Sequence, residues 1–307
     1  MPKVLLATEK PFAQVAKDGI AKIFKEAGFE LILLEKYTEH TDFIKAAADV
    51  DAMIVRSDKT DRQVIQAAKN LKIVVRAGAG YDNIDLDAAT EKGVVVMNTP
   101  GQNSNAVAEL AIGMMIYLNR NCFNGTSGTE LRGKTLGIHA YGNVGKIVGN
   151  IGKGLGMEVY AYDPYIDKVL IENDGVKHAG DVKDLYSKCQ FISLNLPAND
   201  ETRESVNDDL LSLMPRGATL VNTARKEIIC EKSLLKMFRE RPDFRYISDV
   251  APDCKEQIAG NYEGRYFFTP KKMGAQTAEA NINAGLAAAK QIVNFITSGD
   301  TTFQVNK

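Results

Sequence analysis

The sequence predicts an α/β protein made of two doubly wound parallel-sheet domains, one inserted into the other. Short apolar segments alternate with longer segments of helical periodicity along almost the whole chain. This alternation is typical of parallel sheets covered by helices. A first set of strands and helices ends near residue 97, a glycine-rich turn opens a second unit at residues 140–145, and one long helix closes the chain.

The first set reads as a complete parallel α/β unit. Gly28 and Gly93 each follow a helical segment, where glycine adopts the left-handed conformation of a helix C-cap without steric cost. The strands are expected at 4–7, 31–34, 52–55, 73–75 and 94–97, and the helices at 12–27, 42–48, 61–68 and 86–92.

The second set begins with a helix that Ser104 is suited to cap. Its apolar residues fall on one face: Val107, Leu110, Ala111, Met114 and Leu118. A polar loop at 121–128 precedes strands expected at 136–139, 158–162, 191–196, 219–222, 246–249 and 266–268. A final amphipathic helix is expected at 277–298, where Gly299 ends it.

Composition narrows the classes of protein. The 307 residues are 45% hydrophobic and carry a formal net charge of −1. This balance argues against partners such as nucleic acid or a membrane surface. No apolar segment approaches the roughly 20 residues that span a bilayer, and the N-terminus lacks a signal-peptide pattern, so we expect a cytoplasmic protein. The four cysteines form no Cys-x-x-Cys pair, and we expect no structural metal.

The turn at residues 140–145 has the chemistry of a dinucleotide site. Gly142 and Gly145 lie between a strand and a helix, so the backbone can approach a pyrophosphate at the helix N-terminus. Ala140 replaces the first glycine of the usual pattern, which a methyl group permits if φ there is negative. Asp163 ends the following strand, at the place of the acid that binds the adenosine ribose. Because no Arg or Lys follows it directly, NAD is favoured over NADP.

The domain boundaries follow from this motif. We expect residues 1–99 and 282–307 to form a flavodoxin-like substrate domain, and residues 100–281 to form an inserted Rossmann-type NAD domain. Several polar or glycine-rich segments follow predicted strands directly. Ligands of such folds bind at the carboxyl ends of strands, so we expect a site in a cleft between the domains.

Hydride transfer from an alcohol to NAD requires a base for the hydroxyl proton and a cation for the carboxylate. The three histidines are poor candidates for the base: His139 lies in a strand, and His40 and His178 lie in peripheral loops. Arg225 follows a strand, where a solvated role and a carboxylate clamp are equally open. Lys272 precedes the last helix, and its alternative is an ordinary surface lysine.

Several segments resemble the D-isomer-specific 2-hydroxyacid dehydrogenases, in the form without a C-terminal regulatory domain. The similarity covers nearly the whole chain. The segments that carry it are residues 76–85 (RAGAGYDNID), 96–100 (VMNTP), 103–104, 108–109, 128–137 (GTELRGKTLG), 222–225 (NTAR) and 249–250.

The resemblance implies a role for each site residue. Arg225 would be the catalytic arginine that binds the substrate carboxylate. The substrate would also contact Arg56, Ser57, Arg76, Gly78, Ala79, Gly80 and Asn103, with Lys59 as a weaker candidate. NAD would contact Gly142, Asn143, Val144, Gly145, Asp163, Pro164, Leu196, Pro197, Thr223, Ala224, Asp249 and Gly274.

Three positions depart from the family pattern. Lys272 stands where the family has its catalytic histidine, and Cys254 stands where it has the partner glutamate, with Asp253 and Glu256 nearby. We hypothesise that neutral Lys272 takes the hydroxyl proton, its pKa lowered by partial burial, by Arg225 and by the loss of the glutamate. The third departure is a shortened segment before Gly128. The family implies a homodimer, to which this segment often contributes.

The resemblance implies NAD-dependent oxidation of 3-phosphoglycerate to 3-phosphohydroxypyruvate, the first step of serine synthesis. The alternatives are the same chemistry on glyoxylate or hydroxypyruvate, and a non-catalytic NAD-sensing protein on the same scaffold. Arg56, Lys59 and Arg76 favour a phosphorylated small-molecule substrate, although cations also bind plain carboxylates.

Overall fold

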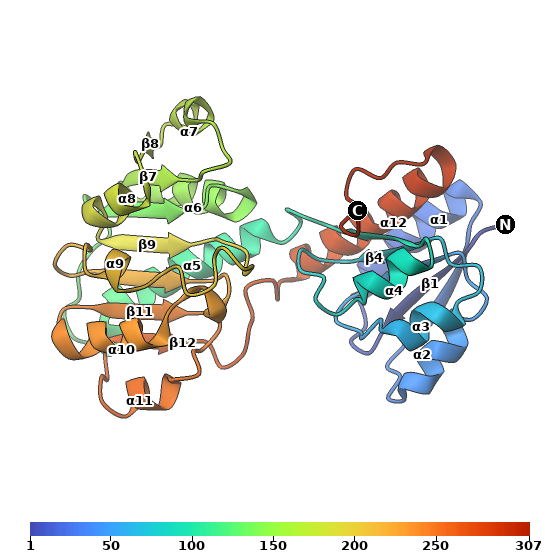
Figure 1. Cartoon of the computed structure of the whole chain (residues 1–307), viewed down its shortest axis with the longest axis horizontal. Helices are drawn as coiled ribbons and strands as arrows, with labels where there is room; N and C mark the ends of the chain where they lie inside the picture. The colour runs from blue at the N-terminus through green and yellow to red at the C-terminus, as the bar shows by residue number, and fades with distance from the viewer. The chain divides into compact units, whose positions relative to one another are not determined.

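The computed structural model describes residues 1–307 and separates into two compact α/β units. Unit 1 contains residues 1–103 and 275–307, and unit 2 contains residues 104–274 (Figure 1). The chain therefore leaves unit 1 after Asn103 and returns to it at Ala275. The expected boundaries, after residues 99 and 281, lie four and seven residues away.

Unit 1 contains a five-stranded parallel sheet in the order β2-β1-β3-β4-β5, which is the flavodoxin-like order. Its strands are β1 (Lys3–Thr8), β2 (Glu30–Glu35), β3 (Ala52–Val55), β4 (Ile73–Arg76) and β5 (Val95–Asn98). Its helices are α1 (Gln14–Ala27), α2 (His40–Ala47), α3 (Arg62–Ala67), α4 (Leu86–Glu91) and α12 (Ala278–Ser298).

Helices cover both faces of this sheet. Leu6 and Ile54 face the core beneath α1 and α12, whereas Leu5 and Met53 face the core beneath α2, α3 and α4. This alternation follows from the two-residue period of a strand. Helices α1 and α12 lie side by side (Figure 1), which confirms that the last helix packs on the first set of elements.

Unit 2 contains a seven-stranded parallel sheet in the order β12-β11-β10-β9-β6-β7-β8. The order reverses between β6 and β9, as in a Rossmann fold. Its strands are β6 (Thr135–His139), β7 (Glu158–Tyr162), β8 (Lys177–His178), β9 (Phe191–Leu194), β10 (Thr219–Asn222), β11 (Arg245–Ser248) and β12 (Tyr266–Phe268). The short strand β8 was not predicted, and β9 ends two residues earlier than expected.

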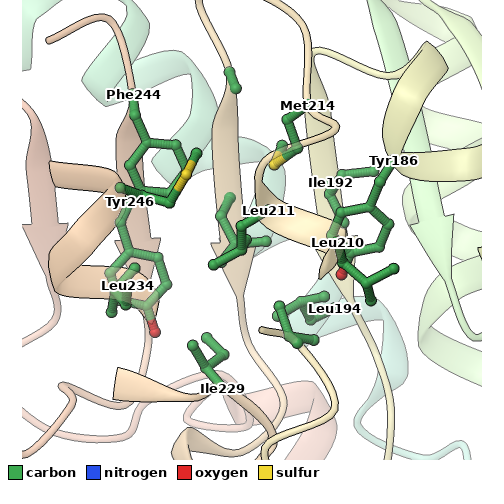
Figure 2. Close-up of a cluster of buried hydrophobic side chains, with 14 of the residues drawn as sticks. Tyr186, Ile192, Leu194, Leu210, Leu211, Met214, Ile229, Leu234, Phe244 and Tyr246 are labelled. Atoms are coloured by element: carbon green, nitrogen blue, oxygen red, sulfur yellow. The ribbon is translucent and has the colours of Figure 1, made fainter. Parts of the chain in front are cut away.

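The helices of unit 2 form two layers over its sheet. The unit contains α5 (Ser104–Asn119), α6 (Asn143–Gly154), α7 (Lys168–Asn173), α8 (Val182–Lys188), α9 (Asp208–Leu211), α10 (Glu231–Glu240) and α11 (Lys255–Ala259), with short 3₁₀ turns η1 (Asn121–Phe123) and η2 (Lys226–Ile228). Helices α8, α9, α10 and α11 pack on one face, over a core that includes Tyr186, Leu211, Leu234 and Tyr246 (Figure 2). On the other face, α5 and α6 cover residues such as Val221.

The shortened segment after α5 contains an unusual backbone turn. Asn121, Cys122 and Phe123 have φ values of 50°, 53° and 55°, so three successive non-glycine residues adopt the left-handed conformation. The Phe123 ring lies 5.3 Å from the Tyr117 ring and remains 64% exposed. This conformation is strained for side chains with a Cβ.

None of the helices in the structure combines the length and the apolar character needed to cross a bilayer.

Residues 304–306 cover the edge strand β5. The Asn306 side chain accepts a hydrogen bond from Val96 N at 2.8 Å and donates to Val94 O at 2.9 Å and to Thr90 Oγ1 at 3.1 Å. Val305 N donates to Val96 O at 2.9 Å. The tail therefore satisfies backbone groups of the edge strand that would otherwise lack partners.

We predict that Asn306→Ala lowers the free energy of unfolding of unit 1 by about 2–3 kcal/mol, because it leaves buried backbone groups unsatisfied. Hydrogen exchange with urea titration should show faster exchange at residues 94–98 and unchanged exchange in unit 2. Lys307→Ala, at an exposed neighbour, is the matched control. Equal protection in both variants would contradict this role.

Candidate functional site

The glycine-rich turn joins β6 to α6 in unit 2. Ala140 has a φ of +76°, which corrects the expectation of a negative value: the alanine adopts the conformation that the first glycine of the pattern usually supplies. A Cβ added to Gly145 would lie 2.3 Å from the carbonyl oxygen of Ala140. Only glycine at 145 therefore lets the helix approach the strand this closely.

Asp163 holds this turn from the end of β7. Its Oδ2 accepts a hydrogen bond from Tyr141 N at 2.8 Å, and its Oδ1 accepts one from Tyr165 N at 2.9 Å. The carboxylate thus connects the glycine turn to the loop that follows β7. A carboxylate oxygen can accept more than one hydrogen bond, so these contacts leave acceptor capacity for a ribose hydroxyl.

The surroundings of α6 fit a dinucleotide. Gly142 is the N-cap residue, no side chain caps the helix, and a Cβ added at Gly142 would meet nothing within 4 Å. The first-turn amides therefore have no side-chain cap, and a pyrophosphate can bind there. Two buried side-chain atoms beyond β9 and β10, Asn195 Oδ1 and Thr223 Oγ1, lack hydrogen-bond partners. Orphaned polar atoms at strand ends are suited to a ligand.

Asn222 shapes the turn that carries Arg225. Its side chain, 1% exposed, accepts a hydrogen bond from Ala224 N at 2.9 Å and donates one to Arg225 O at 2.9 Å. The Arg225 guanidinium donates through Nη1 to Ala224 O at 2.9 Å. The arginine is therefore half-buried on a turn whose backbone is fixed by a buried amide.

Lys272 lies in the loop between β12 and α12. Its side chain is exposed, which corrects the expectation of partial burial. Asp249, directly after β11, accepts hydrogen bonds from Met273 N and Gly274 N, both at 2.8 Å. The sequence placed Asp249 and Gly274 among the cofactor contacts and did not reveal this bond between them.

The position of the family glutamate is occupied by a buried thiol, Cys254. Glu231 at the start of α10 accepts hydrogen bonds from Asp253 N at 2.5 Å and Cys254 N at 3.0 Å. Burial, with the charge of Glu231, raises the pKa of the Cys254 thiol to about 12. Asp253 pairs with Lys226 at 2.5 Å, and Glu256 is 85% exposed beside Lys255.

Arg56 and Arg76 lie at the ends of neighbouring strands β3 and β4 in unit 1. The Arg56 guanidinium donates to Lys10 O at 2.7 Å and to Asn281 Oδ1 at 2.5 Å, and it lies 4.9 Å above the Phe12 ring. Arg76 Nε donates to Arg56 O at 3.0 Å. These contacts fix the two cationic side chains on the same edge of the sheet.

Gly78 permits the close approach of Arg76. Its φ is +152°, and an added Cβ would collide with the Arg76 guanidinium. Asn98 Nδ2 donates to Ala79 O at 2.6 Å, and Thr99 N donates to Gly78 O at 2.9 Å. The predicted segment Gly78–Gly80 is thus held by the strand beside it.

Asp58 lies beside the predicted substrate contacts, and sequence reasoning missed it. It is 2% exposed and accepts hydrogen bonds from Arg56 N at 3.0 Å, Glu9 N at 2.8 Å and Tyr37 Oη at 2.9 Å. The sequence feature that could have revealed Asp58 is its position two residues after Arg56. Of the remaining predicted contacts in unit 1, Ser57 is exposed and Asn103 is half-buried.

The other predicted cofactor contacts also lie beyond strands of unit 2. Asn143 is exposed and Val144 half-buried in the first turn of α6, and exposed Pro164 follows Asp163. Buried Leu196 and exposed Pro197 follow β9, and Ala224 is 9% exposed. Pro164, Leu196 with Pro197, and Ala224 therefore follow β7, β9 and β10, which are consecutive with β6 in the sheet order β10-β9-β6-β7.

His139 is a packed residue of β6, as the sequence indicated. It is 8% exposed, and its Nδ1 lies 3.1 Å from Tyr186 Oη. Burial lowers the pKa of His139 to about 4, against a small opposing effect of Asp163. The imidazole therefore remains neutral in the folded protein near neutral pH.

Comparisons with known proteins place the chain among oxidoreductases. The profile of the D-isomer specific 2-hydroxyacid dehydrogenase catalytic domain matches residues 8–306. A D-3-phosphoglycerate dehydrogenase of Methanocaldococcus jannaschii is 36% identical over 88% of this chain, and a hydroxypyruvate reductase of Thermotoga maritima is 34% identical over 86%. The chain spans 54% of the first relative and 90% of the second.

A solved structure resembles the whole chain. The NAD+-bound 3-phosphoglycerate dehydrogenase of Entamoeba histolytica is 49% identical, with a TM-score of 0.89 over 100% of this chain and 99% of its own. A D-lactate dehydrogenase of Escherichia coli, in its apo form, is 26% identical with a TM-score of 0.79.

We predict that His139 makes the protein sensitive to acid. The pKa of His139 is about 4 in the folded protein and about 6.5 when unfolded. The unfolded state therefore binds the proton first, and stability falls as the pH drops from 6.5 to 4, by about 3 kcal/mol. Urea unfolding across this range should show a shallower decline in His139→Gln than in the wild type. His178→Gln is the control, and an unchanged slope in His139→Gln would disprove the assignment.

Proposed function

The chain belongs to the D-isomer specific 2-hydroxyacid dehydrogenase family, and on this premise we propose that it oxidises D-3-phosphoglycerate to 3-phosphohydroxypyruvate with NAD. The observation that carries the proposal is the pairing of a dinucleotide-type turn, held by Asp163, with a substrate-type unit whose strand ends present Arg56 and Arg76. The names of the relatives from Methanocaldococcus jannaschii and Entamoeba histolytica support the same substrate.

NAD would bind at the N-terminus of α6. The amides of Asn143 and Val144 would hold the pyrophosphate, and Asp163 would accept hydrogen bonds from the adenosine ribose. A carboxylate at this place repels a 2′-phosphate, which favours NAD over NADP. Thr223, whose buried hydroxyl has no partner, would contact the cofactor from the end of β10.

Bound NAD supplies the hydride acceptor as the 2-hydroxy acid becomes a 2-keto acid. Arg225 would hold the substrate carboxylate, since a guanidinium matches a carboxylate in bidentate geometry. Arg56 and Arg76 would bind the phosphate, with Lys59 and Ser57 beside them. Gly78, Ala79 and Gly80 would offer backbone amides to the carboxylate, and Asn103 would complete the substrate contacts.

Lys272 would move the proton. Its neutral amine would accept the proton of the C2 hydroxyl at Nζ during oxidation, and its ammonium would return the proton during reduction. Because the loop leaves Lys272 exposed, the desolvation that favours the neutral amine would come from bound cofactor and substrate.

The second candidate substrate is hydroxypyruvate or glyoxylate. The name of the Thermotoga maritima relative, of which 90% of the length matches, supports hydroxypyruvate. The third candidate is an NAD-sensing protein without turnover.

We also propose a cytoplasmic homodimer. The four cysteines are all free thiols, which suits a reducing compartment, and light scattering would test the dimer.

We predict that Gly145→Ala weakens NAD binding about tenfold or more, because the added methyl group displaces α6 from β6. Isothermal titration calorimetry with NADH measures the effect. Gly154→Ala is the matched control, since a Cβ there meets nothing within 4 Å in the same helix. If both alanine variants bind NADH like the wild type, the cofactor does not sit on this turn.

We predict a strong preference for 3-phosphoglycerate over glycerate and lactate in NAD-linked oxidation, with activity that rises as Lys272 loses its proton. Lys272→Ala should lower kcat by about 10²–10⁴-fold, the usual contribution of a general base, whereas Lys271→Ala should not. Preference for unphosphorylated acids would support the second candidate. NADH binding without turnover on any substrate would support the sensor, and wild-type turnover in Lys272→Ala would exclude Lys272 as the base.

A further inference from the structure

The loop that carries Lys272 begins and ends on a single carboxylate. At its start, the single hydroxyl proton of Thr269 is shared between two acceptors of Asp249, Oδ1 at 3.0 Å and the backbone O at 2.8 Å. At its end, Met273 N donates to Asp249 Oδ1 and Gly274 N donates to Asp249 Oδ2, both at 2.8 Å. Asp249 is 1% exposed, whereas residues 270–273, between these two anchors, are exposed.

Asp249 is itself rigidly placed by the sheet. Its backbone N donates to Asn222 O at 3.0 Å, and Thr269 N donates to Ser248 O at 3.1 Å. The carboxylate is thus built on adjacent strands, and the loop is attached to the carboxylate. Strand-mounted groups position a site more accurately than a loop does by itself.

Gly274 completes the anchor. A Cβ at this position would lie 3.0 Å from Asp249 Oδ2 and 3.3 Å from Val107 Cγ2 of α5. Glycine therefore allows the backbone to pass between the carboxylate and the helix. Gly274 is also the last residue of unit 2, so the same carboxylate fixes Lys272 and the point where the chain leaves the unit.

We propose that Asp249 is a positioning residue that closes the Thr269–Gly274 loop and thereby sets the place of Lys272 in the reaction. This inference deepens the proposed function and rests on it, because Lys272 is the base there. It gives the buried carboxylate a role on the loop backbone, in addition to the cofactor contact that the family resemblance implies.

The chemistry of the contact requires an ion. A carboxylate accepts at both oxygens, whereas an asparagine amide accepts at one and donates at the other. Asp249→Asn keeps the shape but turns a donor toward Met273 N and Thr269 Oγ1, or toward Gly274 N. One of the two amide hydrogen bonds at the end of the loop, from Met273 N or from Gly274 N, must then be lost while the fold of unit 2 remains.

Steady-state kinetics of Asp249→Asn on 3-phosphoglycerate test the assignment. We expect kcat to fall by about 10- to 100-fold, as a displaced catalytic group does, and this loss should remain at saturating NAD. A large rise in the KM for NAD at unchanged kcat would overturn the proposal in favour of a cofactor contact. Asp243→Asn is the matched control, because Asp243 accepts Gly217 N at the opposite end of β11.

A double-mutant cycle shows whether the effect passes through Lys272. In a Lys272→Ala background, Asp249→Asn should change kcat by less than about twofold, since coupled residues are not additive. The full 10- to 100-fold loss in that background would overturn the proposal. Thr269→Val should reproduce part of the loss and Thr269→Ser should restore activity, which keeps the test decisive if Asp249→Asn folds poorly.

Limited trypsin digestion provides a readout that does not depend on activity. Asp249→Asn should speed cleavage after Lys271 and Lys272 about tenfold, because the loosened loop fits a protease better, with other sites unchanged. Equal cleavage in Asp249→Asn and Asp243→Asn would disprove the anchor. If the anchor is confirmed while Lys272→Ala keeps full turnover, the proposed role of Lys272 fails and the structural anchor stands.

Discussion

Both units depend on carboxylates that lie at or just beyond the carboxyl ends of their parallel strands. Asp58 after β3, Asp163 after β7 and Asp249 after β11 each accept backbone N–H groups from the loops that leave the sheet. Parallel strands end together on one edge, where loop amides lose the partners of the ladder. A carboxylate at that edge supplies two strong acceptors at once. The loops that carry the proposed chemistry are therefore held from the sheet by ionic acceptors.

This arrangement has an energetic reason. Burying a carboxylate is costly unless several donors surround it, and Asp249, at 1% exposure, meets Thr269, Met273 and Gly274. Each hydrogen bond to a charged group contributes about 1.5–3 kcal/mol. The loop and the ion therefore stabilise each other: the ion is tolerated because the loop is in place, and the loop is ordered because the ion is there. Asp163 is less buried, which leaves part of its acceptor capacity for a ligand.

Local patterns were enough to predict the fold, because strand and helix periodicity and glycine caps act within short segments. The two parallel sheets, the inserted unit and the packing of α12 on α1 follow from such signals. The short elements β8, α9 and α11 lack a periodic pattern long enough to detect. The φ of +76° at Ala140 could not be predicted either, because a residue with a Cβ seldom adopts a positive φ. The contacts of Glu231 with Asp253 and Cys254, and of Asp249 with Met273 and Gly274, join residues more than twenty positions apart.

A catalytic base must be correctly placed and must be in its neutral form. Because Lys272 is exposed, different groups would meet these two requirements. In the family pattern one glutamate serves both, because it orients the histidine and adjusts its pKa. Here the residue at that place is Cys254, and Glu231 binds the backbone beneath it. Asp249 supplies orientation through amide hydrogen bonds, whereas a negative charge close to Lys272 would stabilise its ammonium form. The Asp249 carboxylate accepts hydrogen bonds from Met273 N and Gly274 N. It can therefore hold the loop while these donors stabilise its charge. A lysine base is therefore compatible with an aspartate anchor, because the aspartate binds the loop through the backbone amides of Met273 and Gly274.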